Sequence, residues 1–206
     1  MRFYPKKKKT QETAGFRVKY IVFYRILDTT VVERLKKGEE SAFRELVETY
    51  QHMVFRVCMG VLHNSSDADD VTQEVFIEVF RSVQKFRSHA KISTWLYRIA
   101  LNKSLNYMRD NRQHKRALQA DGAGMEALSL HASERTPLEV LQEKEKKEAL
   151  EKAVDALPER QKKAFVLSKY EDLSNKEIAR VMKLSVSSVE SLLFRAKQNL
   201  QKSLLA

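Results

Sequence analysis

Apolar residues recur at steps of three and four over most of the chain, which is the spacing of one face of an α-helix. Val31, Val32 and Leu35 form such a pattern before Gly38, a residue type that favours a helix end. A longer stripe follows Ser41, which we expect to cap the second helix. Its members are Phe43, Leu46, Val47, Tyr50, Val54, Val57, Cys58 and Val61. The sequence therefore predicts a helix whose inner face packs against a core.

A third helix is predicted after Asn64-Ser65-Ser66, running to about Val83, with Asp67 among the carboxylates that suit the positive end of its dipole. We expect its buried side to be formed by Val71, Val75, Val79 and Phe80. The other side carries Asp70, Gln73, Glu74, Ile77, Glu78 and Arg81. An aliphatic group among carboxylates favours a protein-binding surface, and a solvated face with one exposed Ile is the alternative.

Residues 85–93 are polar, and Ser93 or Thr94 is expected to cap a fourth helix running from Trp95 to about Arg116. One stripe of this helix carries Arg98, Asn102, Asn106, Arg109 and Gln113, with Trp95, Tyr97 and Tyr107 nearby. Cations follow phosphates, while amides and aromatic rings meet exposed bases, so the stripe favours binding of an unstacked single strand. The aromatic residues alone would fit a helix core equally well.

The C-terminal segment has the pattern of a helix-turn-helix. We expect Ser174 to cap a helix, Lys183-Leu184-Ser185 to form the turn, and Ser187 to cap a second helix through Leu200. Core positions on that second helix are Val189, Leu192 or Leu193, Ala196 and Leu200, which leaves Ser188, Ser191, Arg195 and Lys197 outward. Hydroxyls and cations on such a helix suit insertion into the major groove of DNA. A bare helical hairpin is the alternative.

Between these two parts, residues 120–137 show no sustained apolar period and contain Asp121-Gly122-Ala123-Gly124, which is typical of a linker. The chain is therefore predicted to be all-α, with two small helical domains joined by a flexible linker. We expect an N-terminal extension at residues 1–28, a first domain at 29–116, a linker at 117–137 and a second domain at 138–206.

The amino-acid composition agrees with an all-α fold, and the distribution of charge indicates a polyanionic partner. The chain has only 5 Gly and 3 Pro, and its 38 basic and 27 acidic residues give a net charge of +11. Positive charge gathers in residues 85–116 and 159–206, each next to an acidic segment. Two separate basic blocks predict two places where a polyanion is held.

Other functions find no support in the sequence. The five His residues lie far apart, Asp67, Asp69 and Asp70 lack a calcium-loop pattern, and neither a phosphate loop nor a nucleophile motif is present. We expect no enzyme activity, no metal, no cofactor and no small-molecule substrate. A single Cys58 in an apolar run and the lack of a signal peptide or membrane-spanning stretch predict a cytoplasmic protein without direct membrane insertion.

Two segments of the first domain and two of the second resemble one known family. Residues 67–76 (DADDVTQEVF) and 94–102 (TWLYRIALN) resemble the second region of extracytoplasmic-function (ECF) sigma factors of bacterial RNA polymerase. Residues 156–161 (ALPERQ) and 185–191 (SVSSVES) resemble the fourth region of the same family. The resemblance implies a factor that binds core RNA polymerase and directs promoter recognition, DNA melting and transcription initiation.

The resemblance also implies a role for each segment. Residues expected to bind core polymerase are Asp70, Gln73, Glu74 and Ile77. Residues expected to bind the minus-ten element are Trp95, Arg98, Asn102 and Asn106, together with the 85–93 loop. Residues expected to read the minus-thirty-five element are Ser188, Ser191, Phe194, Arg195 and Lys197. Promoter DNA and core RNA polymerase are then the partners, and family members often have an inhibitory anti-sigma factor.

Two features depart from the family. Glu190 stands where many relatives carry Lys or Arg, and residues 1–28 precede the usual start. Two other functions remain open at this point. A stand-alone helix-turn-helix regulator explains residues 159–206 but not the Ile77 face or the Asn-rich stripe, and a protein-binding adaptor explains neither basic block.

Overall fold

The computed structural model describes residues 30–86, 91–120 and 137–205. Within these ranges it contains helices and no strand, as the sequence predicts. Residues 30–36 are helical and are followed by Gly38, whose φ of 81° ends the helix. The named elements are α2 (Glu40–Leu62), α3 (Ser65–Ser82), η1 (Val83–Lys85), α4 (Ile92–Ala120), α5 (Pro137–Asp155), α6 (Glu159–Lys169), α7 (Asn175–Met182) and α8 (Val186–Leu205).

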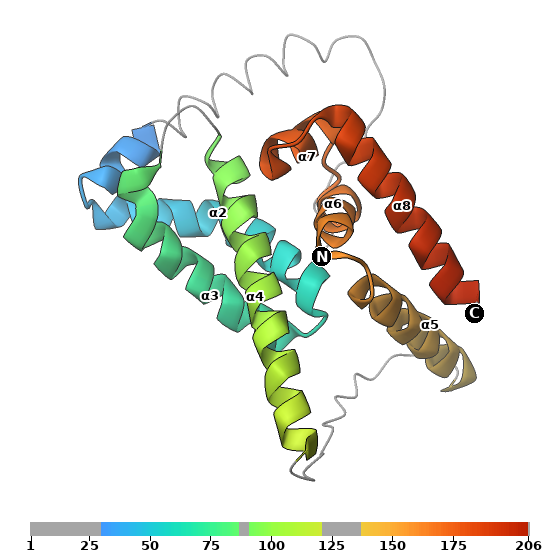
Figure 1. The fold of residues 1–206 in the computed structure, drawn as a ribbon. Helices are drawn as coiled ribbons and strands as arrows, with labels where there is room; N and C mark the ends of the chain where they lie inside the picture. Colours follow the sequence, from blue (N-terminus) through green and yellow to red (C-terminus); the bar gives the residue numbers. More distant parts are fainter. Residues whose placement is uncertain (1–29, 87–90, 121–136, 206) are drawn as a thin grey trace.

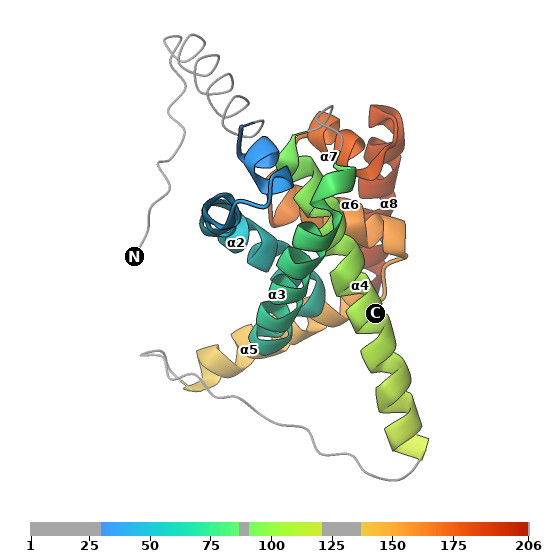
Figure 2. The ribbon, with the colours of Figure 1, turned by 90° about the vertical axis from the view of Figure 1, so that its left-hand side faces the viewer.

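The helices form two groups, which we call the N-terminal unit (residues 30–86 and 91–120) and the C-terminal unit (137–205). In the first, α2, α3 and α4 pack against one another; in the second, α5, α6 and α7 pack against α8. Figure 1 shows α4 at the centre, with α3 on one side, α6, α7 and α8 on the other, and α2 crossing behind it. Seen from the side in Figure 2, α6 and α7 also lie against α4. Helix α4 therefore packs against helices of both units.

Helix starts in the N-terminal unit differ from the predicted caps. Glu39, and not Ser41, is the N-cap of α2, and α4 begins at Ile92 ahead of Ser93 and Thr94. Only α3 has a side-chain cap at its predicted break, where Asn64 Oδ1 accepts a hydrogen bond from the Asp67 N–H at 3.1 Å. Ile92 is buried in the core, and this packing outweighs the preference of Ser and Thr for the N-cap position.

Most side chains of the predicted core are buried, some are half-buried (Phe43, Val47, Tyr50, Leu192 and Leu193), and one is exposed. Val71, Val75 and Val79 are fully buried, and the free thiol of Cys58 is also buried, as expected. Phe80, which we predicted to be buried, is 63% exposed. The prediction was wrong because Phe76, one turn earlier, occupies the core position.

The turn of the helix-turn-helix is held by local hydrogen bonds. Lys183 adopts a left-handed conformation with φ of 55°, and the N–H of Leu184 reaches the Ala179 carbonyl at 3.0 Å. Ser185 Oγ accepts from the Ser188 N–H at 3.1 Å, so Ser185 caps α8 two residues before the predicted Ser187. At the start of α7 the predicted cap is confirmed: Ser174 and Glu177 form a capping box.

We expect Ser174→Ala to lower the free energy of unfolding by about 1 kcal/mol, since it removes one half of the capping box. Chemical denaturation followed by circular dichroism measures this change. Ser203→Ala, at an exposed position in α8, is the control and should leave the midpoint nearly unchanged. An equal loss in both variants would show that the box contributes nothing.

The two units share one hydrophobic core in the described residues. Val166, Leu167 and Val181 of the C-terminal unit belong to the same cluster as Leu96 and Leu101 of α4. The sequence predicted two helical groups but not this contact. A second, smaller cluster lies within the C-terminal unit, formed by Ala153, Val154, Leu157, Ala196 and Leu200.

A glycine sets the spacing between α2 and α6. A Cβ built on Gly60 would lie 3.1 Å from the ring of Tyr170 and 3.2 Å from Val166 Cγ1, closer than ordinary van der Waals contact. Nearby, the Lys162 side chain is only 2% exposed, and its ammonium donates to Asp155 Oδ1 at 2.8 Å and contacts Met108 Sδ of α4 at 3.5 Å. Apolar packing and the ion pair of a buried lysine thus lie at the same junction.

Three sequence predictions concern residues that the structure does not describe or describes only in part. Residues 1–28 and the linker centre at 121–124 lie outside the described residues, as do 87–90 of the polar loop. At the ends of the predicted 117–137 linker, α4 continues to Ala120 and α5 begins at Pro137.

Candidate nucleic-acid and protein interfaces

The outward side of α3 carries an apolar pair among polar groups. Asp70, Gln73, Glu74 and Ile77 are all exposed, as the sequence predicts, and Ile77 retains 49% of its accessible surface. Phe80 lies one turn beyond Ile77, and its ring meets Phe43 edge-on at 5.5 Å between centroids. We call these five residues of α3 the docking face: Asp70, Gln73, Glu74, Ile77 and Phe80.

Large apolar side chains in water are unfavourable, so an exposed Ile and Phe side by side indicate a surface that a partner covers. Sequence reasoning missed Phe80, although its position three residues after Ile77 is the signal that could have found it. The carboxylates of Glu74 and Glu78 lie 3.7 and 3.9 Å from the Lys103 ammonium, so part of the local negative charge is balanced by α4.

The residues predicted to meet a single strand lie on one stripe of α4, which we call the α4 stripe: Trp95, Arg98, Asn102 and Asn106. Trp95 is half-buried and packs on Phe86, with ring centroids 4.9 Å apart. Asn106 is exposed. Trp95 therefore contributes to the core as well as to the surface.

Arg98 is held by the end of α7. Its Nε donates to the Val181 carbonyl at 2.7 Å, and its Nη2 donates to the Arg180 carbonyl. Carbonyls in the last turn of a helix lack intrahelical partners and carry partial negative charge, so a guanidinium satisfies them and suits the helix dipole. Burial lowers the pKa of Arg98 from its usual value. The structure thus places a predicted DNA-binding cation in a protein contact.

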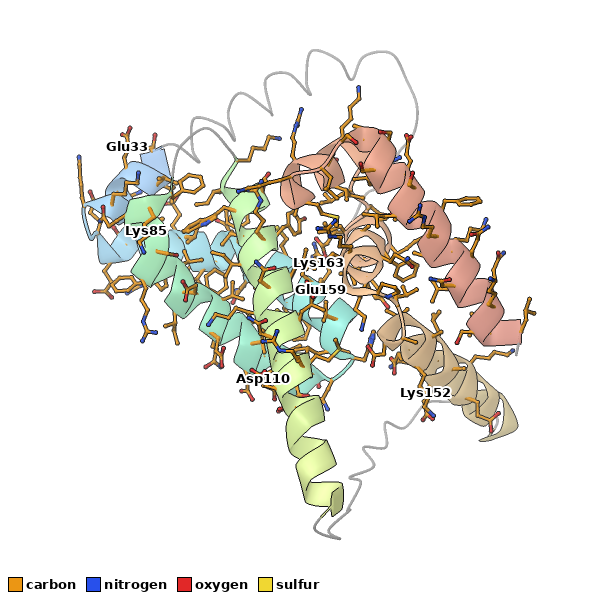
Figure 3. All side chains as sticks on the ribbon, in the orientation of Figure 1. Glu33, Lys85, Asp110, Lys152, Glu159 and Lys163 are labelled. Carbon is orange, nitrogen blue, oxygen red and sulfur yellow. The ribbon has the colours of Figure 1, made fainter. Side chains whose placement is uncertain are left out.

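Asn102 is also engaged by the C-terminal unit. Lys163 Nζ donates to Asn102 Oδ1 at 3.0 Å and forms an ion pair with Glu159 at 2.7 Å. Figure 3 shows Glu159 and Lys163 on the side of α6 that faces α4. The hydrogen bond and charge of Lys163 lower the pKa of Glu159. Two of the four members of the α4 stripe therefore contact the other unit.

A buried carboxylate in the loop between α6 and α7 joins α2 and α4 near this contact. Glu171, whose side chain is 1% exposed, accepts from Arg56 of α2 at 2.8 and 2.9 Å and from the Tyr97 hydroxyl of α4 at 3.0 Å. Burial, with the nearby Glu171 carboxylate, raises the pKa of Tyr97. Sequence reasoning missed Arg56 and Glu171 as partners, and no local signal marks them, because they stand 115 positions apart.

The outward side of α8 presents the predicted recognition residues, which we call the α8 face: Ser188, Ser191, Phe194, Arg195 and Lys197. All five are exposed, and Phe194 is 63% exposed. Together with Glu190 and Gln198, three of them line a shallow hollow. Hydroxyls, a guanidinium and an aromatic ring here are suited to base edges and phosphates in a major groove.

Glu190, the acidic residue at a position where a cation is common, has a contact within the protein. Asn175 Nδ2 donates to Glu190 Oε1 at 3.4 Å, a long hydrogen bond between the first residue of α7 and α8. The carboxylate therefore helps to set the two helices of the motif against each other. Glu190 lies next to the α8 face, where its carboxylate adds a negative charge beside Arg195.

Two further findings concern the described ranges only. They hold no cluster of His, Cys, Asp or Glu side chains arranged to bind a metal ion. None of their helices combines the length and apolarity needed to cross a membrane.

Comparisons with known proteins place both units in one family. Residues 46–114 match sigma-70 region 2, and residues 147–200 match sigma-70, region 4. The RNA polymerase sigma-H factor of Pseudomonas aeruginosa is 34% identical over 184 residues, covering 86% of this chain and 93% of the relative. The ECF RNA polymerase sigma-E factor of Escherichia coli (strain K12) is 33% identical over 178 residues, covering 84% and 92%.

Two solved structures share the fold. CnrH in complex with the cytosolic domain of CnrY has a TM-score of 0.60 at 21% identity, covering 85% of this chain and 96% of the other. The sigma factor RpoE in complex with the anti-sigma factor NepR from Bartonella quintana has a TM-score of 0.55 at 18% identity, covering 80% and 97%. At these identities the likeness concerns the arrangement of helices alone.

Proposed function

Because this chain belongs to the ECF family of RNA polymerase sigma factors, it acts in promoter recognition and transcription initiation, and we propose that three surfaces divide this work. The observation that carries the proposal is that the three predicted residue sets lie on three different helices, α3, α4 and α8. Each set has a side-chain chemistry of its own. We assign region 2 to residues 29–116 and region 4 to 138–206, with a linker at 117–137.

The docking face on α3 binds core RNA polymerase. Its exposed Ile77 and Phe80 supply apolar area, and the surrounding Asp70 and Glu74 suit a partner whose apolar patch is ringed by basic groups. This chemistry is that of a protein interface, since nucleic acid would be repelled by the carboxylates.

The α4 stripe binds the opened minus-ten element. Asn102 and Asn106 offer amides to the edges of exposed bases, Arg98 offers a cation to phosphate, and Trp95 offers the free part of its ring. The α8 face reads the minus-thirty-five element as duplex, where a helix enters the major groove. Melting and duplex recognition are thus assigned to separate units.

We expect Arg195→Ala to weaken recognition of the upstream element by about 1–3 kcal/mol, because Arg195 is exposed on the α8 face where a guanidinium reaches base edges or phosphate. Binding of holoenzyme to promoter fragments, measured as affinity, tests this. Lys202→Ala, exposed near the far end of α8, is the matched control. A pre-melted template should not restore the loss, and restoration would assign Arg195 to melting instead.

Membership of the sigma-factor family also bears on catalysis, cellular location and partners. Sigma factors in general are non-catalytic, and we assign no reaction, cofactor or small-molecule substrate to this chain. Bacterial transcription places it in the cytoplasm. Because the two solved relatives above are complexes with CnrY and with the anti-sigma factor NepR, we infer an anti-sigma factor as a further partner.

One experiment tests the function as a whole. The full chain is added to sigma-free core polymerase with a promoter library, and initiated transcripts are sequenced. Transcripts that require the chain and share upstream elements support the proposal. Duplex binding without core and without transcripts would favour a stand-alone helix-turn-helix regulator.

A further inference from the structure

The shallow hollow on α8 brings a carboxylate and a guanidinium to one surface. Its five lining residues are all exposed: Glu190, Ser191, Phe194, Arg195 and Gln198. Residues four apart on a helix are neighbours, so positions 190 and 194, 191 and 195, and 194 and 198 form one continuous patch. A duplex that enters along this patch and reaches Arg195 therefore lies against Glu190 as well.

Glu190 lies at the edge of this patch that is nearest to α7. The preceding residue, Val189, is buried in the core, and α7 packs against α8. Asn175 Nδ2 of α7 donates to Glu190 Oε1 at 3.4 Å, which is long for a hydrogen bond. Within the described residues this is the only polar contact of the carboxylate, and no cation there forms an ion pair with it. Its other oxygen, Oε2, is therefore available to accept a hydrogen bond from a ligand.

A carboxylate without a neutralising cation is restricted in what it can contact on DNA. It repels phosphates, so it adds nothing to the part of binding that is independent of sequence. It only accepts hydrogen bonds, so its partner must be a donor. The donors that bases expose in the major groove are the N4 amine of cytosine and the N6 amine of adenine, and adenine has its N7 acceptor beside the amine. Cytosine is therefore the base whose edge suits Glu190.

The neighbouring side chains of the hollow suit other bases. Arg195 only donates, and a guanidinium pairs with the O6 and N7 acceptors of guanine. Phe194, one turn after Glu190 and 63% exposed, offers apolar contact to the methyl group of thymine. Because the three side chains suit three different base edges, a change at Glu190 alone should alter the preference at one base pair and leave the others as they are.

We propose that Glu190 is a specificity-determining residue of the α8 face: its carboxylate accepts a hydrogen bond from the exocyclic amine of one cytosine in the upstream element. The inference rests on the function proposed above for the α8 face and deepens it. A cation at this position would strengthen binding to any sequence through phosphate. The carboxylate instead makes binding depend on one C·G pair.

Substitutions that retain or remove the acceptor test the proposal. Glu190→Gln has the same length and keeps an oxygen that can accept from Asn175, so the contact between α7 and α8 can remain. Glu190→Ala removes the acceptor altogether. Glu145→Gln makes the same chemical change at an exposed position of α5 and is the matched control. Chemical denaturation of each full-length variant checks that its stability matches that of the wild type.

The readout is the base preference of holoenzyme at each position of the upstream element. Promoter duplexes randomised over that element are bound by holoenzyme, and the bound fraction is sequenced. We expect the wild type and Glu145→Gln to prefer cytosine at one position by about tenfold over any other base. Glu190→Ala should show no preference at that position. Glu190→Gln should prefer adenine there, because an amide accepts from N6 and donates to N7.

Unchanged preferences at every position in both Glu190 variants would overturn the proposal, because the carboxylate would then contact no base. A uniform loss of affinity for all sequences would also overturn it, because Glu190 would then act only through the packing of α7 on α8. Loss of a preference for a base other than cytosine would overturn the assignment of cytosine.

Failure of the function proposed for the α8 face gives a different result. In that case wild-type holoenzyme enriches no upstream element, and Arg195→Ala binds promoter fragments as tightly as the wild type. If the wild type enriches an upstream element and Arg195→Ala weakens its recognition, the function of the face holds. The two Glu190 variants then decide the inference by themselves.

Discussion

Replacement of both Ile77 and Phe80 by Glu is expected to reduce the affinity for core RNA polymerase by about 1000-fold. Ile77 is 49% and Phe80 63% exposed, so each can contribute apolar surface to a partner's pocket. Apolar anchors at the centre of an interface commonly cost 2 kcal/mol or more when lost, which is about 30-fold each. A Glu at either position also adds a carboxylate to a surface that already carries Asp70 and Glu74.

The measurement is a titration of core polymerase with labelled chain, and promoter-specific transcription should fall in parallel. Leu205→Glu, at the most exposed large apolar residue of the described ranges, is the matched control and should bind normally. Because Phe80 meets only the edge of Phe43 among aromatic rings, thermal unfolding should change little. A well-folded double variant with wild-type core affinity would remove α3 from the polymerase interface.

Asn102→Ala is expected to lower the rate of open-complex formation by about tenfold or more while sparing core binding and upstream recognition. Capture of an unstacked base must offset an unstacking cost of a few kcal/mol, and loss of one amide contact removes part of that stabilisation. The residue is exposed, so its truncation should not unfold the N-terminal unit. Permanganate footprinting of promoter DNA with holoenzyme measures the opened fraction over time.

Lys163→Ala is the control that separates the two roles of Asn102. Lys163 contacts Asn102 from the C-terminal unit and is not a member of the α4 stripe, so its loss should leave opening by the holoenzyme at the wild-type rate or faster. A template with a mismatched bubble across the minus-ten element should restore part of the Asn102→Ala loss, because melting is then already achieved. If Lys163→Ala slows opening equally, Asn102 acts through its contact with α6. If Asn102→Ala opens promoters at the wild-type rate, the melting role belongs to the 85–93 loop.

Apart from Phe80, the residues in both predictions were chosen from sequence, and the helical period explains why that was possible. Positions three and four apart on a helix lie on one side whatever the helix packs against. Ile77 and its carboxylate neighbours therefore had to share a face once α3 formed. The same holds for Arg195 and Ser191 on α8.

The exact ends of helices, and the burial of single side chains, were less predictable from the sequence. Ser174 caps α7 as expected because its capping box is local, whereas α4 begins at Ile92 because Ile92 is buried by distant residues. Phe80 and Phe76 are both large, aromatic and on the same helix. Which of the two enters the core depends on how α3 is rotated against its neighbours, and the apolar pattern of α3 alone suits either.

The sequence by itself determined the helices and the division of their surfaces into apolar and polar sides, because both depend on local spacing. The family was indicated separately, by the resemblance of four short segments to known sigma factors. Only the tertiary structure decided that the C-terminal unit lies on the α4 stripe. Arg56 and Glu171 are 115 positions apart, and Arg98 bonds to main-chain carbonyls that any residue type would supply. Such contacts leave no periodic signal in either partner, since they depend on how two separately formed helical groups fit together.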